Sequence, residues 1–427
     1  MYTTGKSGGM DRRVFLQTAG VAAAAFTFGT TRRVRAASAN DKLGIGVIGC
    51  GGRGNNHLDG WNWLKSQGDN LEIVAVCDVY RPRMQKTAEK FSAKGYMDHR
   101  ELLADPRVDI VSIATPDHLH APQTIDAVRA GKGVYCEKPI THWRQFELLK
   151  KMRDEVKKSK CAFLLGTQGM SDGAWHEMKK LVKEGLIGQP IHAECGYFRV
   201  GDWGERGMPI DDPNAKPGTD LNWEAFLGDS PQRAFDVSRF FRWRMYEDYA
   251  GGPVTDLFPH SFTPVADILG VGTPSMVVAT GGKFRYEERE IPDTFNMLID
   301  YPEKCTAAVL GTQGNDFVAE GQRGAPGRIP VIRGWDGSLM IDRKTNKIAF
   351  VPTEGSGKKT QFFDIEYGED FGAHLRNLVQ CHRQGRQDSF SPIDLAFSVQ
   401  TALIMGMLAL REQTAAKYDA VKQQIVL

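Results

Sequence analysis

Residues 43–54 read LGIGVIGCGGRG, a short apolar run followed at once by a glycine-rich turn. Leu43–Ile48 has the composition of a strand, and a helix is expected directly after the turn, over Asn55–Ser66. The pattern G-x-G-x-x-G between a strand and a helix is typical of dinucleotide-binding turns, where the backbone approaches a pyrophosphate at the helix N-terminus. The expected cofactor-binding positions of this turn are Gly49, Gly51, Gly52, Arg53 and Gly54.

The second apolar run, Leu71–Cys77, ends at Asp78. A carboxylate at the tip of this strand can accept hydrogen bonds from a ribose 2′-hydroxyl and repels a 2′-phosphate, so NAD is favoured over NADP. Arg81 and Arg83 follow closely and leave NADP open as the alternative.

Strands and helices continue to alternate up to residue 165. The further expected strands are Val108–Ala114, Gly133–Cys136 and Cys161–Leu165, and the expected helices are Arg81–Phe91, Ala121–Ala130 and one from a cap at Thr141 to Lys158. This alternation predicts an α/β fold with a doubly wound parallel sheet, whose ligands lie beyond the carboxyl ends of the strands.

The second half of the chain has longer, separate runs of strand character. They are Ile191–Val200, Ser275–Gly282, Thr294–Tyr301 and Thr306–Thr312, and the Gly/Arg-rich stretch Gln313–Arg333 is expected to be a long loop.

Composition excludes several functional classes. The 54 Lys+Arg and 52 Asp+Glu residues leave a formal charge of +2, which argues against a nucleic-acid-binding protein that works by neutralising phosphates. No uncharged apolar stretch of the length needed for a permanent membrane span is present. The seven cysteines have no C-x-x-C spacing, and no paired His/Cys cluster predicts a metal site.

The N-terminus has the pattern of an export signal. Arg12 and Arg13 precede a mild apolar run over residues 18–28, and Ala37-Ser38-Ala39 supplies small residues for cleavage. Paired arginines before such a run resemble the twin-arginine class, so we expect residues 1–39 to engage the twin-arginine export machinery and the mature protein to be periplasmic or otherwise exported.

Three motifs follow one another along the chain: Gly49–Gly54, Thr115-Pro116 with His120, and Glu137-Lys138-Pro139. Together they resemble the Gfo/Idh/MocA oxidoreductase family. The resemblance implies a Rossmann domain, expected at residues 40–167, and a C-terminal α/β domain with an open, mostly antiparallel sheet, expected at residues 168–427. The C-terminal helices are expected to pack back on the Rossmann domain.

The resemblance also implies roles for individual residues. Thr115, Pro116, His120, Glu137, Lys138 and Gln168 are expected to bind the cofactor. Lys138 is further expected to reach the substrate hydroxyl, because a cation there lowers the cost of a developing alkoxide. For His120 a core or helix-capping role is the alternative.

The stretch Gly251–His260 is similar to a glycine-rich segment of the family that projects an Asp and a His, four residues apart, into the active site. On this resemblance His260 takes the hydroxyl proton and Asp256 holds substrate hydroxyls or orients His260. Pro259 fits only the first turn of a helix, so we expect Asp256 to lie before that helix. A structural pair that ties down a loop is the alternative.

Aromatic residues are frequent in the second half, and Trp243, Arg244 and Tyr246 are the expected substrate-binding residues. An aromatic wall beside charged groups suits a sugar ring, which has apolar faces and a polar rim. The sequence therefore predicts an exported oxidoreductase that uses tightly bound NAD to act on a sugar or polyol, and that forms a homo-oligomer. The alternatives are a glycosidase that uses NAD for transient oxidation at C3 followed by elimination, and a sugar-binding or redox-sensing protein without turnover.

Overall fold

The computed structural model describes residues 41–201, 208–318 and 328–427. The predicted export signal, residues 1–39, lies outside the described residues.

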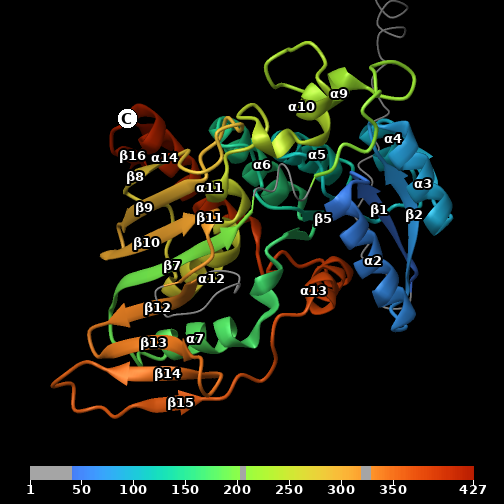
Figure 1. The fold of residues 1–427 in the computed structure, drawn as a ribbon. Coiled ribbons are helices and arrows are strands. Elements are labelled where there is room, and N and C mark those ends of the chain that lie inside the picture. Colours follow the sequence, from blue (N-terminus) through green and yellow to red (C-terminus); the bar gives the residue numbers. More distant parts are fainter. Residues whose placement is uncertain (1–40, 202–207, 319–327) are drawn as a thin grey trace, which may run out of the picture. The chain divides into compact units, whose positions relative to one another are not determined.

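Six parallel strands form the first sheet, in the order β3-β2-β1-β4-β5-β6. Figure 1 labels β1, β2 and β5 of this sheet. The strands are β1 (Leu43–Ile48), β2 (Leu71–Cys77), β3 (Lys94–Tyr96), β4 (Ile110–Ile113), β5 (Gly133–Cys136) and β6 (Phe163–Leu165). The connecting helices are α2 (Gly52–Ser66), α3 (Arg81–Phe91), α4 (His99–Ala104), α5 (Asp117–Arg129) and α6 (Phe146–Ser159). Because the chain crosses over between β1 and β4, the loops beyond their carboxyl ends diverge and leave a crevice for a ligand.

Three helices begin elsewhere than predicted. α2 begins at Gly52, three residues before the expected start at Asn55. α5 begins at Asp117, four residues before the expected start. α6 begins at Phe146, so the prediction of a helix cap at Thr141 is wrong. Thr141 is fully buried, and its carbonyl oxygen accepts a hydrogen bond of 3.0 Å from Nε2 of Gln400. This tertiary contact holds the chain between β5 and α6 in an irregular conformation.

The second sheet is open and mixed, in the order β15-β14-β13-β12-β7-β10-β9-β8-β16-β17. Its strands are β7 (Pro190–Val200), β8 (Met276–Gly282), β9 (Thr294–Tyr301), β10 (Cys305–Thr312), β12 (Arg328–Gly334), β13 (Gly337–Asp342), β14 (Lys347–Pro352), β15 (Gln361–Phe363), β16 (Ala416–Asp419) and β17 (Gln424–Val426), with β11 (Gly314–Asn315) beside β7. β7 and β10 are parallel, and the other described neighbours are antiparallel. The predicted α/β fold class is confirmed.

The prediction of a loop over Gln313–Arg333 is wrong at both ends. β11 pairs with the end of β7, and β12 pairs with β7 over most of its length. The backbone groups along β7 recruit both segments into the sheet, and this tertiary pairing overrides the weak local pattern.

Helices α7 (Gly173–Lys183), α12 (Phe258–Leu269) and α14 (Ile393–Glu412) cover one face of the second sheet (Figure 1). By length and composition α14 could cross a membrane, but 72% of the apolar window is buried inside the protein. Packing against the sheet and α6 therefore accounts for its apolar sequence. Helix α13 (Phe371–Gln384) returns to the first domain, where Leu375 and Leu378 share a core with Leu58 and Trp61 of α2.

Residues 208–250, which we call the cover segment, contain the short helices α9 (Trp223–Leu227), α10 (Val237–Phe241) and η2 (Trp243–Met245). The cover segment is fixed to the end of β2. Asn222 N donates to Val79 O at 2.9 Å, and Tyr80 forms a bridge with Leu221. The ring of Tyr80 packs edge-on against Phe241 with centroids 5.6 Å apart. These contacts hold part of the second domain at the carboxyl end of β2 in the first (Figure 1).

Candidate active site

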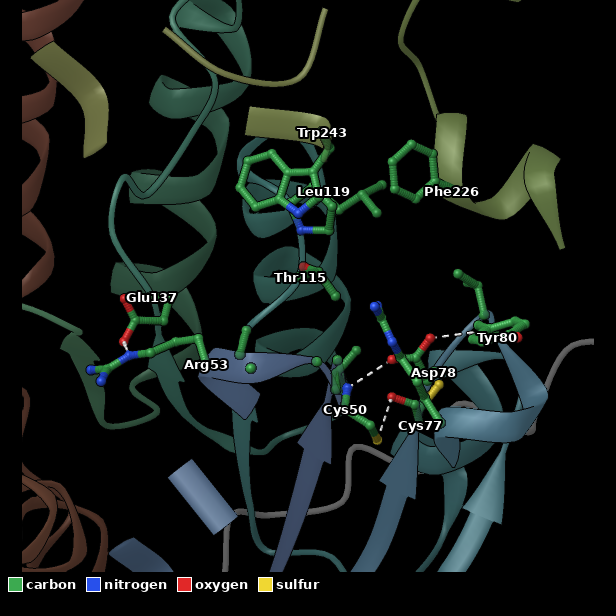
Figure 2. A pocket seen from close by; sticks show the side chains of 18 of the residues that line it. Cys50, Arg53, Cys77, Asp78, Tyr80, Thr115, Leu119, Glu137, Phe226 and Trp243 are labelled. Carbon is green, nitrogen blue, oxygen red and sulfur yellow. Dashed lines mark hydrogen bonds and ion pairs between the residues drawn. The ribbon is translucent and has the colours of Figure 1, made fainter. Parts of the chain in front are cut away.

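One large cavity of about 1540 Å³ lies at the carboxyl ends of the strands of the first sheet, and the cover segment and the second sheet complete its walls. The sequence-predicted residues that line it are Gly49, Gly51, Gly52, Arg53, Asp78, Thr115, Pro116, Glu137, Lys138, Gln168, Trp243, Arg244, Asp256 and His260. Gly54, His120 and Tyr246 are not among its lining residues. Figure 2 shows Trp243 and Phe226 on the side opposite Asp78 and Cys50.

The glycines of the first turn divide into two kinds. Gly49 has φ +93°, and a Cβ on Gly54 would lie 1.8 Å from the carbonyl oxygen of Gly49, so these two positions require glycine for the turn and for helix packing. A Cβ on Gly52 would meet no atom within 4 Å. Gly51 and Gly52 therefore leave room beside the cavity at the N-terminus of α2, where backbone N–H groups favour an anion.

Asp78 closes this turn from the side of β2. Its Oδ2 accepts a hydrogen bond from Cys50 N at 2.8 Å, and its Oδ1 accepts one from Tyr80 N at 2.9 Å (Figure 2). Burial raises the pKa of Asp78, although the nearby Arg83 charge opposes that shift. Each carboxylate oxygen keeps acceptor capacity for a further donor such as a ribose hydroxyl.

His120 lies behind the cavity wall. Its Nε2 is 2.7 Å from Thr115 O, and its Nδ1 is 2.6 Å from Pro139 O. Burial lowers its pKa to about 4, so the ring is neutral and donates to one of these carbonyls at a time. The structure therefore places His120 as a link between the Thr115 loop and the turn after β5.

Glu137 is the centre of a buried ionic network. It accepts a hydrogen bond from Arg53 Nε at 2.6 Å (Figure 2) and one from His57 Nε2 at 2.9 Å. Burial opposes its ionisation, but the Arg53 charge and His57 outweigh burial and hold the pKa of Glu137 well below its ordinary value. Arg53 Nη2 also donates to Gln168 Oε1 at 3.3 Å, so the predicted cofactor residues Arg53, Glu137 and Gln168 form one unit.

At the other end of the cavity, Lys138 and Asp256 form an ion pair. Lys138 Nζ donates to Asp256 Oδ1 at 2.8 Å and to the Asp256 carbonyl oxygen at 2.7 Å. Arg244 Nε lies 3.3 Å from the same Oδ1. Burial alone would raise the pKa of Asp256, but the Lys138 and Arg244 charges hold it well below its ordinary value. The pair is only 10% and 13% exposed, which keeps the ammonium group fixed.

His260 shares this end of the cavity with Lys138. Asp256 closes helix α11 (Pro253–Asp256), and His260 lies in the first turn of α12 with Pro259 at its start, so Asp256 precedes the helix of His260. Among the described contacts Asp256 bonds to Lys138 and Arg244 rather than to His260. Burial and the Lys138 charge lower the pKa of His260 to about 3, so its imidazole is neutral near pH 7.

Two of the three predicted substrate-binding residues line the cavity, and the third does not. Arg244 stacks on the Trp243 ring, with its guanidinium carbon 4.3 Å from the ring centroid, and both line the cavity. Tyr246 points elsewhere, because its hydroxyl donates to Ser238 Oγ at 2.7 Å and Arg239 covers its ring at 4.3 Å. Tyr197 from β7 lines the cavity instead, with its ring centroid 6.5 Å from that of His260.

Sequence reasoning missed two buried groups at this site. His57 bridges Glu137 and Ser112, whose Oγ is 2.9 Å from His57 Nδ1. Asp117, the first residue of α5, is 3% exposed and borders a small void of about 10 Å³ with Arg244 and Asp256. Burial, reinforced by the Asp256 charge, raises the pKa of Asp117 to about 8. The sequence signal for His57 is its position three residues after Gly54 on the predicted helix, and the signal for Asp117 is its position directly after Thr115-Pro116.

The polar groups that line the cavity fit a nicotinamide dinucleotide. The glycine turn offers an open backbone at a helix N-terminus, Asp78 offers a carboxylate at the tip of β2, and Lys138 offers a fixed cation near the second domain. Within the described residues, no three His, Cys, Asp or Glu side chains converge as a metal site.

Comparison with known proteins agrees with this arrangement. Residues 43–167 match the profile of the Gfo/Idh/MocA oxidoreductase family, NAD-binding Rossmann fold, and residues 172–330 match the profile of its C-terminal α/β domain. The chain is similar to inositol 2-dehydrogenase of Salmonella typhimurium (strain LT2), at 31% identity over 160 residues, 37% of this chain and 46% of that protein. It is also similar to levoglucosan dehydrogenase of Pseudarthrobacter phenanthrenivorans, at 32% identity over 211 residues, 46% of this chain and 50% of that protein.

These matches span about half the length of the curated relatives. Among solved structures, a levoglucosan dehydrogenase in complex with NADH matches with a TM-score of 0.66 and 19% identity, over 88% of this chain and 98% of that one. At this identity the likeness shows the fold. Together the two family profiles match residues 43–167 and 172–330, more than half of the chain, and the chain belongs to the Gfo/Idh/MocA oxidoreductase family, with its NAD-binding Rossmann domain followed by its C-terminal α/β domain.

Proposed function

We propose that the protein is an NAD-dependent oxidoreductase that transfers a hydride between the nicotinamide and a hydroxyl-bearing carbon of a sugar, glycoside or polyol. The observation that carries the proposal is the position of Lys138 and neutral His260 in the same cavity as the glycine turn and Asp78. The relatives named as inositol and levoglucosan dehydrogenases support this reaction class. When bound, NAD supplies the hydride acceptor.

Side chains of the protein bind the substrate hydroxyl group and accept its proton. Lys138 donates a hydrogen bond to the substrate oxygen and stabilises the negative charge that develops there, while Asp256 holds the ammonium group in position. His260 is neutral and accepts the hydroxyl proton during oxidation. Trp243 and Tyr197 offer apolar faces to the ring, and Arg244 binds hydroxyl groups at its rim.

A panel of sugars, glycosides and polyols tests this function, with reduced nicotinamide followed by its fluorescence. We expect nicotinamide reduction with at least one polyol or sugar, and loss of this signal in Lys138→Met. The relatives do not favour the glycosidase alternative. Release of phenol from nitrophenyl glycosides without net nicotinamide reduction would establish it and refute the dehydrogenase.

We further propose that the cofactor is tightly held. The cover segment closes one wall of the cavity and is bonded to the end of β2, which supports slow dissociation. Denaturing the purified protein should release about one equivalent of nucleotide. Full activity of protein purified without nucleotide, on adding substrate alone, would exclude a nicotinamide mechanism altogether.

Export by the twin-arginine machinery to the periplasm remains a proposal from the sequence. The pair Arg12-Arg13, the apolar run and Ala37-Ser38-Ala39 support it. Fractionation of cells that produce the full chain and its Arg12→Lys/Arg13→Lys variant tests it. Only the unaltered chain should reach the periplasm, and equal distribution of the two would contradict this localisation.

The open face of the second sheet supports a homo-oligomer. Val278, Leu298, Ala308, Glu194 and Val331 are successive neighbours in the strand register, so a mostly apolar row crosses the sheet. Leu298 is 55% exposed and alternates with buried neighbours, so the row lies opposite the helices. Light scattering should show an oligomer that Leu298→Glu dissociates. A monomeric parent protein would refute the proposal.

A further inference from the structure

Arg83 lies where a cofactor 2′-phosphate would be recognised. It lines the cavity together with Asp78, and its Nη1 is 3.6 Å from the position that a Cβ on Gly51 would occupy. An arginine near the carboxyl end of the second strand can accommodate the 2′-phosphate of NADP. By position alone, Arg83 therefore favours NADP while Asp78 favours NAD.

The second domain changes what Arg83 can do. Oδ2 of Asp211, a residue of the cover segment, lies 2.6 Å from both Nε and Nη2 of Arg83 and forms an ion pair with its guanidinium. Asp211 also lines the cavity. The guanidinium carbon lies 4.9 Å from the ring centroid of Phe241 and 6.0 Å from that of Tyr80. Two donor groups and both neighbouring rings thus fix the guanidinium toward Asp211.

We propose that Asp211 sets the cofactor preference from the second domain, by holding Arg83 in an ion pair and denying its guanidinium to a 2′-phosphate. Asp78 and Asp211 also place two carboxylates beside this position, and a 2′-phosphate would be repelled by both. The inference rests on the proposed binding of a nicotinamide dinucleotide and adds a specificity residue that comes from outside the Rossmann domain.

The neighbouring pair Arg81–Asp220 supplies a matched control. Arg81 Nε lies 3.1 Å from Asp220 Oδ1, again between α3 and the cover segment. Neither Arg81 nor Asp220 lines the cavity, and both are more exposed than Arg83. Asp220→Asn therefore removes an equivalent interdomain ion pair without freeing a cation at the cofactor site.

The experiment is a competition between nucleotides. The full chain, Asp211→Asn, Asp220→Asn and Asp211→Asn/Arg83→Gln are each freed of bound nucleotide and then incubated to equilibrium with equal, saturating NAD⁺ and NADP⁺. Free nucleotide is removed, the protein is denatured, and the released nucleotides are quantified by mass spectrometry. Thermal unfolding of each variant without nucleotide verifies that it is folded.

We expect Asp211→Asn to raise the ratio of bound NADP⁺ to NAD⁺ by about tenfold or more, because a hydrogen bond to a charged phosphate becomes available. Asp220→Asn should keep the parent ratio, and adding Arg83→Gln should restore it. An unchanged ratio in Asp211→Asn, or an equal rise in Asp220→Asn, would overturn the inference. A rise that persists in the double variant would remove Arg83 from the inference and leave the lost repulsion by the Asp211 carboxylate as the cause.

A separate result addresses the proposed function. If the parent chain retains neither nucleotide, the cofactor proposal fails and this inference fails with it. If the parent chain retains NAD⁺ but Asp211→Asn does not change the ratio, only the role of Asp211 fails.

Discussion

Replacing Asp117 by Asn should remove part of the dependence of the free energy of unfolding on pH. An aspartate ordinarily titrates near 3.8, but burial raises the pKa of Asp117 to about 8 in the folded protein. Between these values the folded state binds a proton that the unfolded chain has lost, so this residue makes the protein less stable as pH rises. At 1.36 kcal/mol per pH unit, the loss reaches about 4 kcal/mol at pH 7 and levels off at about 6 kcal/mol above pH 8.

Asparagine has nearly the same shape and does not titrate. Urea unfolding at several pH values, followed by the fluorescence of the eight tryptophans, measures the free energy of unfolding. We expect the Asp117→Asn variant to resemble the parent near pH 4 and to be the more stable protein at pH 9. Parallel stability curves for the two proteins over this range would refute a raised pKa for Asp117.

Asp105 provides a control of opposite sign. Hydrogen bonds from Arg107 outweigh burial and lower the pKa of Asp105, whose Oδ2 also accepts from the Tyr96 hydroxyl at 2.9 Å. Its carboxylate stabilises the fold above the unfolded pKa, and this contribution is lost as pH falls through the folded pKa. Asp105→Asn should therefore lower stability at pH 7 and approach the parent as the pH becomes acidic.

Three further outcomes test the site. Gly54→Ala should lower the free energy of unfolding by about 3 kcal/mol or more, since its Cβ would lie 1.8 Å from a carbonyl oxygen. Gly52→Ala should unfold like the parent but retain less nucleotide. Equal stabilities of the Gly54→Ala and Gly52→Ala variants would contradict the packing argument. Lys138→Met should lower kcat about 10²-fold to 10⁴-fold, whereas unaltered turnover would remove Lys138 from catalysis. Because burial lowers the pKa of His260 to about 3, the rate of oxidation should not change near pH 6.5 through titration of His260. A fall in rate below pH 6.5 that is absent in His260→Gln would show that His260 becomes charged there.

Much of the first domain could be predicted from the sequence. The bounds of β1, β2 and β5 agree with the prediction, because buried strands of a parallel sheet are continuous apolar runs. Ligands of such sheets lie beyond the carboxyl ends of the strands, and these ends share one edge, so Asp78 and Lys138 could be expected beside one cavity.

Partners far apart in the chain could not be predicted. Asp256 is 118 residues from Lys138, and Asp211 is 128 residues from Arg83. Local patterns contain no information about such pairs, because the contacts form only when the second domain packs on the first. The same limit explains why His120 and Tyr246, both predicted at the site, bond to groups behind or away from the cavity wall.

The sequence by itself determined the dinucleotide turn, the order of strands and helices in the first domain, and the residue types that carry the chemistry. These features follow from local periodicity and from the conformational freedom of glycine. Only the tertiary structure decided which groups are charged and which are available. Burial keeps His260 neutral and raises the pKa of Asp117, and Asp211 engages Arg83, because desolvation and ion pairing depend on neighbours that the fold brings together.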